Sequence, residues 1–486
     1  MRWALLLFSL LLLLPVTVGA RTWHILPDGS GDEPTIQAGI DAAAHHDTIL
    51  VAPGTYFEKI DFEGKKVTVG SHFMTTGDTS WISQTVIDGQ GTYGSVATFE
   101  NSEESLSILC GLTLTGGFGT AYGYVLGAGI FINGASPTLL HLIIRENGST
   151  LSDLIGGGIA VRQGSPFIDH VRIENNEAGY YCGGFACLGS DSRPILRNSV
   201  IAGNWGDGST AVDIDAGAHA TLENVSITGN LSSTAFASIL CLSHSRLDLI
   251  NVTVTGNDGL YMDLSSGATI VLVNSILWSN NTPEVYFSEY GGTNTLIVSH
   301  CTIAGGLEGI ETNGQGTVEW LDGNLEDDPQ FLNAGEGDYG LAPGSPCIDA
   351  GTPHFVWDDE ILIDLGPEDY CGDAPDMGAL EYCPDPAAIR ESWMLPRSVL
   401  RVYPNPSTAW ATASFTLDRP QSVTISIFDL GGRLVSCLIA GSLRPGVHSI
   451  RWDGNDVTGR PVESGTYFYR LNVNGESVSK RVLLAR

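Results

Sequence analysis

The sequence is poor in basic residues. Its 486 residues include 23 Lys and Arg against 55 Asp and Glu, which gives a formal net charge of -32. A surface this acidic repels phosphate backbones, so the composition argues against a nucleic-acid-binding protein. Hydrophobic residues make up 43% of the chain, which is ordinary for folded domains, and the length allows two or three of them.

Beyond its N-terminus the sequence lacks any apolar run of the about 20 residues that a membrane span needs. The first 20 residues differ, because Arg2 precedes an apolar run (4–14) and small residues occupy positions 18–20. This pattern is typical of a secretory signal peptide. We therefore predict cleavage after Ala20 and a mature chain without a transmembrane span, either secreted or held at the outer cell surface.

Nine cysteines in an exported chain permit disulfides, and their odd number leaves at least one thiol free. Cys347, Cys371 and Cys383 lie near one another in irregular sequence, which permits a disulfide among them with the pairing left open. Their spacing does not match a zinc module. The thiols that sit in apolar alternation are expected to be buried small hydrophobes. These are Cys110, Cys187, Cys241, Cys301 and Cys437.

The middle of the chain repeats itself about every 27 residues. Segments 137–147, 166–176 and 194–204 align without gaps, and each unit carries a second short apolar run upstream, such as 157–161. Both halves alternate with period two and are rich in β-branched residues, and neither shows a helical stripe. Helical solenoids are thereby excluded, and a leucine-rich repeat is disfavoured because both halves are strands. We predict a right-handed parallel β-helix of about eight coils, with repeats over residues 94–340.

One polar position recurs at the same place in the repeats. Side chains there would stack about 4.8 Å apart, and stacked amides bond each other and the turn backbone. We predict a structural ladder rather than a histidine metal site, because asparagine replaces histidine at most rungs. The predicted ladder comprises His141, His170, Asn198, Asn224, Asn251, Asn274 and His300.

The N-terminal stretch 21–93 predicts a cap and the first coils. Thr35 suits an N-cap, and Ile36, Ile40 and Ala43 line one face of a short helix that can plug the open end of a coil. The motifs at 23–32, 34–43 and 48–56, with the repeats, resemble the right-handed parallel β-helix superfamily of pectate lyases and periplasmic copper-processing proteins. The resemblance covers residues 21–310 and implies the fold.

Residues 341–383 resemble the closing segment of secreted β-helix surface proteins and are expected to form a C-terminal cap. The acidic cluster at 358–360 and Asp364 could hold calcium, but it lacks the spacing of a recognised calcium loop. We therefore expect no cofactor, and calcium remains an unsupported alternative.

After a linker (384–400), residues 401–486 show a new pattern. Alternating segments at 422–435, 446–462 and 465–471 are separated by turn residues, which predicts a small sandwich of about seven strands. The motifs resemble the type A C-terminal sorting domain of the type IX secretion system and the Ig-like domain of flagellar hook-capping proteins. The resemblance implies passage through an outer-membrane secretion translocon, with the domain either cleaved or attached to surface lipopolysaccharide.

Alternation also predicts which side chains face out of the coil: Ile159 and Val161 point inward, so Arg162 points outward. Aromatic rings stack on sugars and carboxylates bond their hydroxyls, so an outward groove of such residues is typical of glycan binding. Two carboxylates could perform acid–base glycoside chemistry, and an arginine could serve as the base of a lyase. The glycan-binding candidates are Phe131, Asp215, Tyr261 and Tyr286, and the catalytic candidates are Asp213, Asp263 and Arg162.

A complete catalytic set is missing from the sequence. The combined motifs of a polygalacturonase are absent, the repeats are nearly free of lysine, and no serine-hydrolase elbow, HExxH or P-loop occurs. We expect an exported, monomeric adhesin or glycan-binding protein whose partner is a polysaccharide or cell-surface glycan. The alternatives are a polysaccharide lyase or glycoside hydrolase that uses the same groove, and a purely structural spacer.

Overall fold

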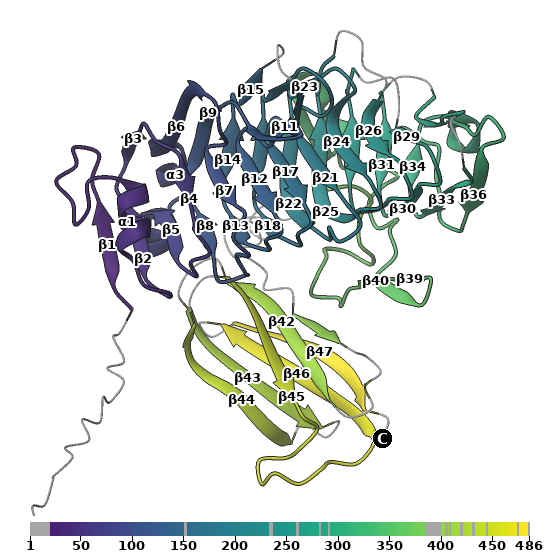
Figure 1. Ribbon diagram of the computed structural model, residues 1–486. Helices are drawn as coiled ribbons and strands as arrows, with labels where there is room; N and C mark the ends of the chain where they lie inside the picture. The colour runs from purple at the N-terminus through teal and green to yellow at the C-terminus, as the bar shows by residue number, and fades with distance from the viewer. Residues whose placement is uncertain are drawn as a thin grey trace, which may run out of the picture.

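The computed structural model of the chain shows an elongated β-rod with a smaller β-domain beside it (Figure 1). The rod has parallel strands that wind around one axis, and the smaller domain has antiparallel strands. The structure describes residues 20–149, 153–232, 237–258, 262–280, 283–289, 292–384, 400–403, 407, 410–417, 421–429, 433–443, 446–473 and 476–484. The predicted signal peptide, except Ala20, and nearly all of the predicted linker lie outside these residues.

One side of the rod is a ten-stranded parallel sheet, which we call sheet B. Each turn of the chain adds one strand to it, so the described rod makes about ten turns. The repeats alone predicted about eight coils, because the first turns lack recognisable copies of the repeat. In order along the rod, the strands are β4 (Ile60–Asp61), β7 (Ala97–Phe99), β12 (Ile130–Asn133), β17 (Ile159–Arg162), β21 (Phe185–Leu188), β24 (Ser209–Asp215), β26 (Ala237–Cys241), β29 (Met262–Leu264), β32 (Val285–Phe287) and β35 (Ile310–Glu311).

The other sides form a 20-stranded sheet, sheet A, which bends along a corner. Most turns contribute two stretches to it, one on each side of the corner. Its strands are β1 (Thr22–Ile25), β2 (Thr48–Val51), β3 (Gly54–Tyr56), β5 (Thr68–Ser71), β6 (Thr85–Thr92), β8 (Ile108–Cys110), β9 (Thr113–Gly117), β13 (Thr138–Leu140), β14 (Ile143–Arg145), β18 (Phe167–Asp169), β19 (Arg172–Glu174), β22 (Ile195–Ala202), β25 (His219–Thr228), β27 (Arg246–Ile250), β28 (Thr253–Thr255), β30 (Thr269–Val273), β31 (Ile276–Trp278), β33 (Asn294–Ser299), β34 (Thr302–Ile303) and β36 (Gly316–Trp320).

Short strands extend the loops outside these two sheets. They are β10 (Thr120–Tyr122), β11 (Tyr124–Leu126) and β16 (Leu154–Ile155) in one small sheet, β15 (Gly148–Ser149), β20 (Glu177–Ala178) and β23 (Trp205–Gly206) in a second, and the hairpins β37 (Phe331–Asn333) with β38 (Asp338–Leu341) and β39 (His354–Trp357) with β40 (Glu360–Asp364). Two short 3-10 helices, η1 (Gly306–Gly309) and η2 (Ala334–Glu336), complete the loops.

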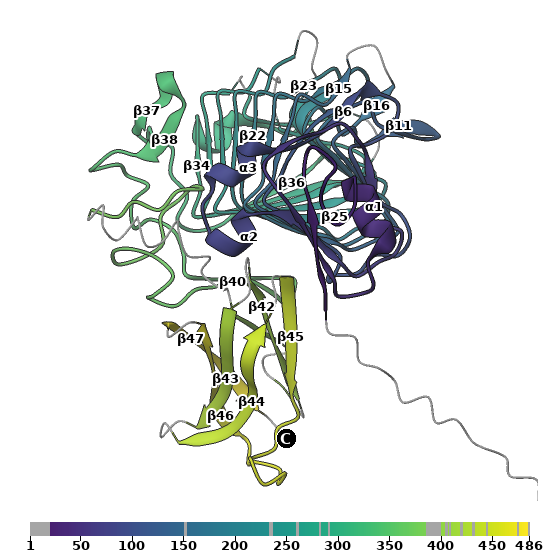
Figure 2. The same ribbon diagram turned by 90° about the vertical axis from the view of Figure 1, so that its left-hand side faces the viewer.

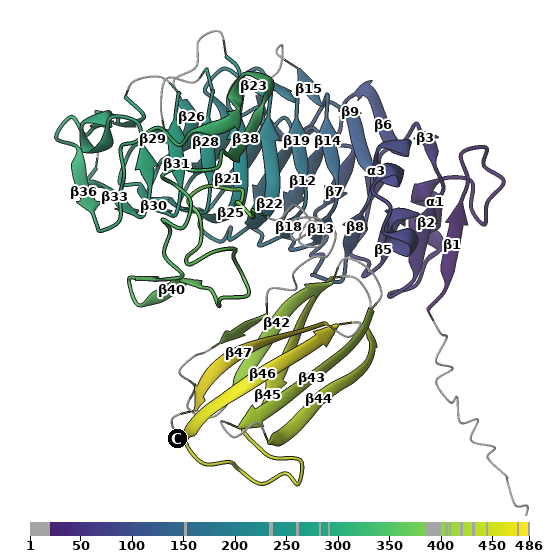
Figure 3. The same ribbon diagram turned by 180° about the vertical axis from the view of Figure 1, so that it is seen from behind.

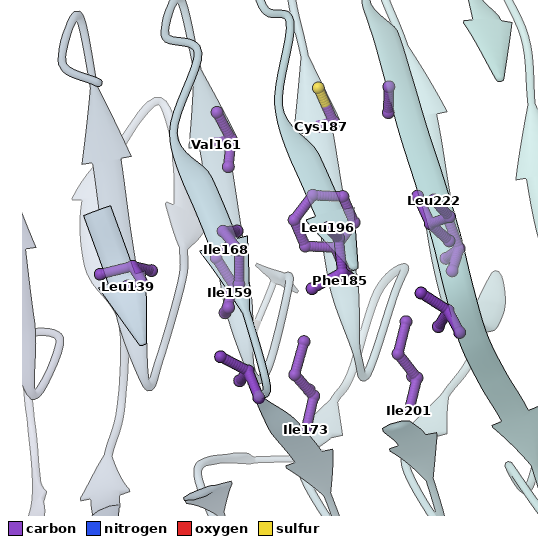
Figure 4. Close-up of a cluster of buried hydrophobic side chains, with 14 of the residues drawn as sticks. Leu139, Ile159, Val161, Ile168, Ile173, Phe185, Cys187, Leu196, Ile201 and Leu222 are labelled. Carbon is purple, nitrogen blue, oxygen red and sulfur yellow. The ribbon is translucent and has the colours of Figure 1, made fainter. Parts of the chain in front are cut away.

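The core of the rod is a set of stacked apolar rows. The parallel register places Leu139 beside Ile168, Ile168 beside Leu196, and Leu196 beside Leu222, and all four are completely buried. Figure 4 shows these side chains repeating from coil to coil. Period-two alternation of apolar residues therefore becomes a continuous core once the coils stack.

The N-terminal end of the rod, which faces the viewer in Figure 2, is covered by helix α1 (Ile36–Ala42). The Thr35 hydroxyl accepts a hydrogen bond from the Ala38 backbone N–H at 3.1 Å, as an N-cap does. Ile36 and Ile40 are completely buried in the main core. Two further short helices, α2 (Phe73–Thr76) and α3 (Ser80–Gln84), pack with β5, β6 and β9 of sheet A.

A buried ladder of asparagine amides runs along the rod. Each Nδ2 donates to the Oδ1 of the next member at 2.9 or 3.0 Å. Gly117 N–H donates to the first Oδ1, and the last Nδ2 donates to Glu284 Oε2 at 2.8 Å. Every bond therefore points in the same direction along the axis. The members are Asn147, Asn176, Asn204, Asn230, Asn257 and Asn280.

The row predicted as the ladder occupies the corner of sheet A and is not a continuous amide ladder. All seven residues have φ between 47° and 56°, the left-handed region in which asparagine is enriched. Asn224 donates to Asn198 at 3.0 Å, and the His141 and His170 rings stack at 4.6 Å. Asn274 instead bonds the backbone of Thr352. The polar residues at this corner are selected mainly by backbone conformation, so their side chains find different partners.

Residues 341–383, predicted as a C-terminal cap, lie along the flank of the last coils. Phe355 and Ile363 of the β39–β40 hairpin pack on Val271 and neighbouring residues on the outer surface of sheet A. Cys347 and Met377 pack around Ile276 in the same way. The segment therefore buries a lateral apolar surface. Figure 3 shows the hairpin strand β40 beneath the rod.

The cysteines divide as their contexts indicated, with the exception of Cys437. Cys371 and Cys383 form a disulfide, whereas Cys347 is a buried free thiol. Cys110, Cys187, Cys241 and Cys301 are also buried and free. The Cys437 thiol is exposed, although its alternating context predicted burial.

The C-terminal domain consists of seven described strands in two antiparallel sheets. One sheet has β41 (Arg401–Tyr403), β42 (Ala411–Leu417) and β45 (Gly446–Trp452); the other has β43 (Gln421–Asp429), β44 (Leu434–Leu443), β46 (Gly465–Val473) and β47 (Glu476–Leu484). The predicted small sandwich is confirmed. Trp452 and Tyr469 fill its core, and the Tyr469 hydroxyl donates to the Ala411 carbonyl across the sheets at 2.6 Å. Among the described residues, none of the helices has the length and apolarity that a bilayer crossing requires.

Candidate functional site

The outward surface of sheet B carries one side chain per turn in a straight central row. The parallel register fixes this row, with neighbours spaced about 4.8 Å apart. From the N-terminal to the C-terminal end, the row contains Asp61, Thr98, Phe131, Ala160, Ala186, Asp213, Leu240, Asp263, Tyr286 and Glu311. Its second half thus holds most of its carboxylates and its tyrosine.

The middle of the row, from Phe131 to Asp263, is buried, whereas Tyr286 is half-buried and Glu311 is exposed. Phe131 faces away from the main core, as alternation predicted, but it is completely buried in a cluster with Leu126, Ile155 and Cys182. These residues come from β11, from β16 and from the loop before β21. Phe131 therefore offers no surface to a glycan, which corrects its assignment as a binding residue. Alternation predicted the direction of the Phe131 side chain, but it could not predict which loops cover that side chain.

Asp213 is a buried carboxyl group. Its side chain lies between Ala186 and Leu240 in the row, with 3% of its surface exposed, and its Oδ1 has no hydrogen-bond partner in the described structure. Burial, reinforced by the charge of Asp215, raises the pKa of Asp213 to about 8. At neutral pH this group is therefore mostly protonated, and it can donate a proton.

Asp263 is also buried, with both carboxylate oxygens bonded. The Ser288 hydroxyl lies 2.8 Å from Oδ1 and 2.7 Å from Oδ2, and the Ser288 backbone N–H donates to Oδ1 at 3.2 Å. Burial raises the pKa of Asp263, and the bonds from Ser288 oppose that rise. Leu240 lies between the two acids in the row, so their Cα atoms are roughly 10 Å apart.

Arg162 lies apart from the two acids. It belongs to a parallel row that runs through Asn133, Leu188 and Asp215, two residues along the strands from the central row. Its Nη1 donates to Asn133 Oδ1 at 3.2 Å, and its guanidinium lies 4.6 Å from the centre of the Tyr122 ring. The structure therefore does not assemble Arg162, Asp213 and Asp263 into one catalytic group.

The remaining glycan-binding candidates are Tyr286, Asp215 and Tyr261. Tyr286 is half-buried in the row between Asp263 and Glu311. Asp215 is half-buried and accepts a hydrogen bond from the Ala216 backbone N–H. Tyr261 lies outside the described residues.

A group of tyrosines beside sheet B was missed by the sequence reasoning. Tyr122, Tyr124 and Tyr180 are 46%, 54% and 43% exposed. The Tyr124 and Tyr180 rings are stacked, with centroids 5.9 Å apart and an interplanar angle of 14°. These residues lie between the repeated strands, where the repeat alignment gives no register. The glycine-flanked aromatics at 122–124 were nevertheless a visible signal for an exposed turn.

The site is chemically suited to hydroxyl-rich ligands. It combines carboxyl groups, aromatic rings and one arginine on a single side of the rod. Within the described ranges, no three His, Cys, Asp or Glu side chains are grouped so that they could hold a metal ion. Of the acidic residues considered for calcium, Asp358 and Asp359 form the β39–β40 turn and have positive φ, whereas Glu360 and Asp364 lie at opposite ends of β40. Glu360 pairs with Arg246 at 3.2 Å.

The fold defines a parallel β-helix protein with an appended antiparallel domain. Residues 405–477 of that domain match the FlgD Ig-like domain. No curated protein is matched by the chain.

Several solved structures are similar to parts of the chain, among them PorU, PorZ and a pectin methylesterase. Dimeric latent PorU from Porphyromonas gingivalis is 26% identical over 18% of this chain and 9% of its own, with a TM-score of 0.16. PorZ, described as a surface component of the type-IX secretion system of the same organism, is 21% identical over 18% and 12%, with a TM-score of 0.15. Carrot pectin methylesterase is 13% identical over 63% and 90%, with a TM-score of 0.36. The chain thus spans only a small part of PorU and PorZ.

Proposed function

We propose that this protein is an exported surface protein that binds a polysaccharide along the outward surface of sheet B. The observation that carries the proposal is the C-terminal end of the central row, where the half-buried Tyr286 and the exposed Glu311 occupy adjacent strands next to the buried Asp263. Carboxylates that accept hydroxyl hydrogen bonds, next to an aromatic ring that stacks on a sugar, are the usual elements of a glycan site. Their repeat along the axis suits an extended chain.

A glycan array probed with the full chain tests this proposal. We expect binding to at least one polysaccharide class, with affinity lowered in Tyr286→Ala. Tyr339→Ala is the matched control, because Tyr339 lies on the β37–β38 hairpin outside sheet B and packs against Phe331. If the full chain binds no polysaccharide on the array, the proposal is wrong.

A second candidate function is cleavage of the bound glycan, and the protonation of Asp213 favours it. A carboxyl group with a pKa of about 8 can act as a general acid at neutral pH, while a second carboxylate acts as a base. The assay is release of reducing or unsaturated ends from polysaccharides. If Asp213 and Asp263 are the catalytic pair, this activity should disappear in Asp213→Asn and also in Asp263→Asn.

Export through a dedicated translocon is the cellular part of the proposal. It is supported by the signal-peptide pattern of residues 1–20 and by the FlgD Ig-like match at 405–477. Mass spectrometry of the extracellular and surface fractions provides the test. We expect the chain to begin near Arg21, and removal of residues 401–486 to leave it inside the cell envelope. Unchanged export of that truncated chain would contradict the role of the domain.

A further inference from the structure

We propose that Tyr122, Tyr124 and Tyr180, which we call the tyrosine shelf, form a stacking site for the sugar rings of the same ligand. This inference rests on the proposed polysaccharide binding and identifies where on the protein the polysaccharide is held. The shelf arises from two local features. Tyr122 and Tyr124 pair across the tip of the β10–β11 hairpin, and Gly123 at the tip has a φ of 80°. Tyr180 lies in the loop between β20 and β21.

The position of the shelf is fixed by the buried cluster beneath it. Leu126 and Ile155 anchor β11 and β16 over Phe131, and Cys182 anchors the loop that carries Tyr180. All three anchoring residues are at most 6% exposed. The tyrosines above them therefore stand on a packed base, although about half of each side chain meets solvent.

The tyrosine rings hold one another in a fixed arrangement. Tyr124 and Tyr180 are nearly parallel, and the Tyr181 ring stands perpendicular to Tyr180 with centroids 4.5 Å apart. This perpendicular contact holds the Tyr180 ring in place. Aromatic side chains that are ordered before binding lose little conformational entropy when they stack on a ligand.

The composition of the shelf favours a sugar over an apolar protein partner. The three tyrosines are exposed, whereas the aliphatic residues packed beneath them, Leu126 and Ile155, are buried. Protein-binding patches usually combine aromatic with aliphatic area. A surface of rings that each carry a hydroxyl instead suits a ligand with apolar ring faces and hydroxylated edges.

Arg162 adds hydrogen-bond donors to the shelf. Its guanidinium lies against the Tyr122 ring and, among the described residues, makes one hydrogen bond, from Nη1 to Asn133. A guanidinium has five N–H donors, so most of them remain for ligand hydroxyl oxygens. Arg172 and Arg246, by contrast, are paired with carboxylates. Arg162 was predicted as a catalytic base, and here it takes a binding role.

The shelf and the open end of the row lie along one side of the rod. Tyr180 lies in the loop that leads into β21, and Tyr286 is four strands further along sheet B, on β32. Four steps correspond to roughly 19 Å along the axis. A ligand that touches both must therefore be an extended oligosaccharide, and a monosaccharide can reach only one of them.

Binding of the array-identified polysaccharide and its oligosaccharides to the full chain tests this inference by calorimetry. We expect Tyr124→Ala/Tyr180→Ala to weaken binding about tenfold or more, because two stacking contacts are lost. Affinity should rise with oligosaccharide length in the wild type and rise less in this variant. Tyr124→Phe/Tyr180→Phe keeps the rings and should retain most of the affinity.

The matched control is Trp410→Ala in the C-terminal domain. Trp410 is 38% exposed and has the Arg451 guanidinium 4.2 Å from its ring, so it reproduces a shelf-like pair elsewhere in the chain. Its replacement should leave affinity unchanged. Wild-type affinity in the tyrosine double-alanine variant would overturn the shelf while polysaccharide binding itself stands. Absence of any glycan binding by the wild type would instead overturn the proposed function.

Discussion

At the residue scale, two rows of asparagines look alike in sequence but have different structural roles. Asn204 is completely buried, its Oδ1 accepts from Asn176, and its Nδ2 donates to Asn230 and to the Ile173 carbonyl. Asn224 has a φ of 56° and is half-buried at the corner of sheet A. The first residue satisfies buried polar groups, whereas the second mainly permits a left-handed backbone.

This difference predicts the effect of replacing each residue. Asn204→Ala should lower the stability of the rod by about 3 kcal/mol, because it leaves several buried donors and acceptors unpaired. Asn224→Gly should cost less than about 1 kcal/mol, since glycine adopts positive φ freely. Urea unfolding followed by circular dichroism provides the comparison. Equal losses in the two variants would show that both rows serve the same purpose.

At the element scale, the sequence was sufficient for the strands and the stacking. The β-helix and the small C-terminal sandwich follow from alternation and turn residues, and the Thr35 cap was visible as well. What could not be predicted was how irregular segments pack. Phe131 reads as an outward residue on its strand, and only the tertiary placement of residues 124–126 and 180–182 buries it. Loop packing depends on contacts between distant segments, which no local period records.

The disulfide in residues 341–383, which lie along the flank of the rod, should have a local effect on stability. Cys371 and Cys383 are 12 residues apart, and the loop they close borders the β39–β40 hairpin segment on sheet A. Replacing both with serine removes a constraint of about 3 kcal/mol from the unfolded segment. Hydrogen exchange should therefore quicken in residues 354–364 and stay unchanged in sheet B. Cys437→Ser, at an exposed free thiol, is the control, and unaltered exchange in the hairpin would refute the prediction.

At the scale of the whole molecule, buried carboxyl groups control the pH dependence of stability. Burial raises the pKa of Asp213 to about 8, of Glu284 to about 7 and of Asp376 to about 6, and it also raises the pKa of Asp263. A carboxyl group with a raised folded pKa binds its proton more tightly when folded. Its contribution is complete below its unfolded pKa, about 4, and is lost as the pH rises through the folded value.

The rod should therefore become more stable as the pH falls from 8.5 to 6.5. Below that range His141 acts in the opposite direction, because burial lowers its pKa to about 3 and it stays neutral in the folded chain while the unfolded chain gains a proton. Asp169 also acts in the opposite direction, because nearby Arg197 and its hydrogen bonds lower its pKa, but its contribution is lost only below about pH 4. Melting temperatures between pH 4 and 9 provide the measurement. Glu284→Gln and Asp213→Asn mimic the protonated groups, so each should flatten the alkaline limb. A melting temperature that rises from pH 6.5 to 8.5 would contradict the prediction.

The uniform direction of the amide ladder has a consequence for the history of the chain. In each turn, the asparagine Oδ1 accepts a hydrogen bond from the Nδ2 of the turn before it, and its own Nδ2 donates the same bond to the next turn. One turn is therefore a complete repeating unit of the ladder. Gene duplication or deletion of one whole unit leaves no orphaned amide inside the rod, whereas loss of half a unit does. Lineages of such proteins should therefore differ in length by complete turns, and the terminal pieces that meet Gly117 and Glu284 should change least.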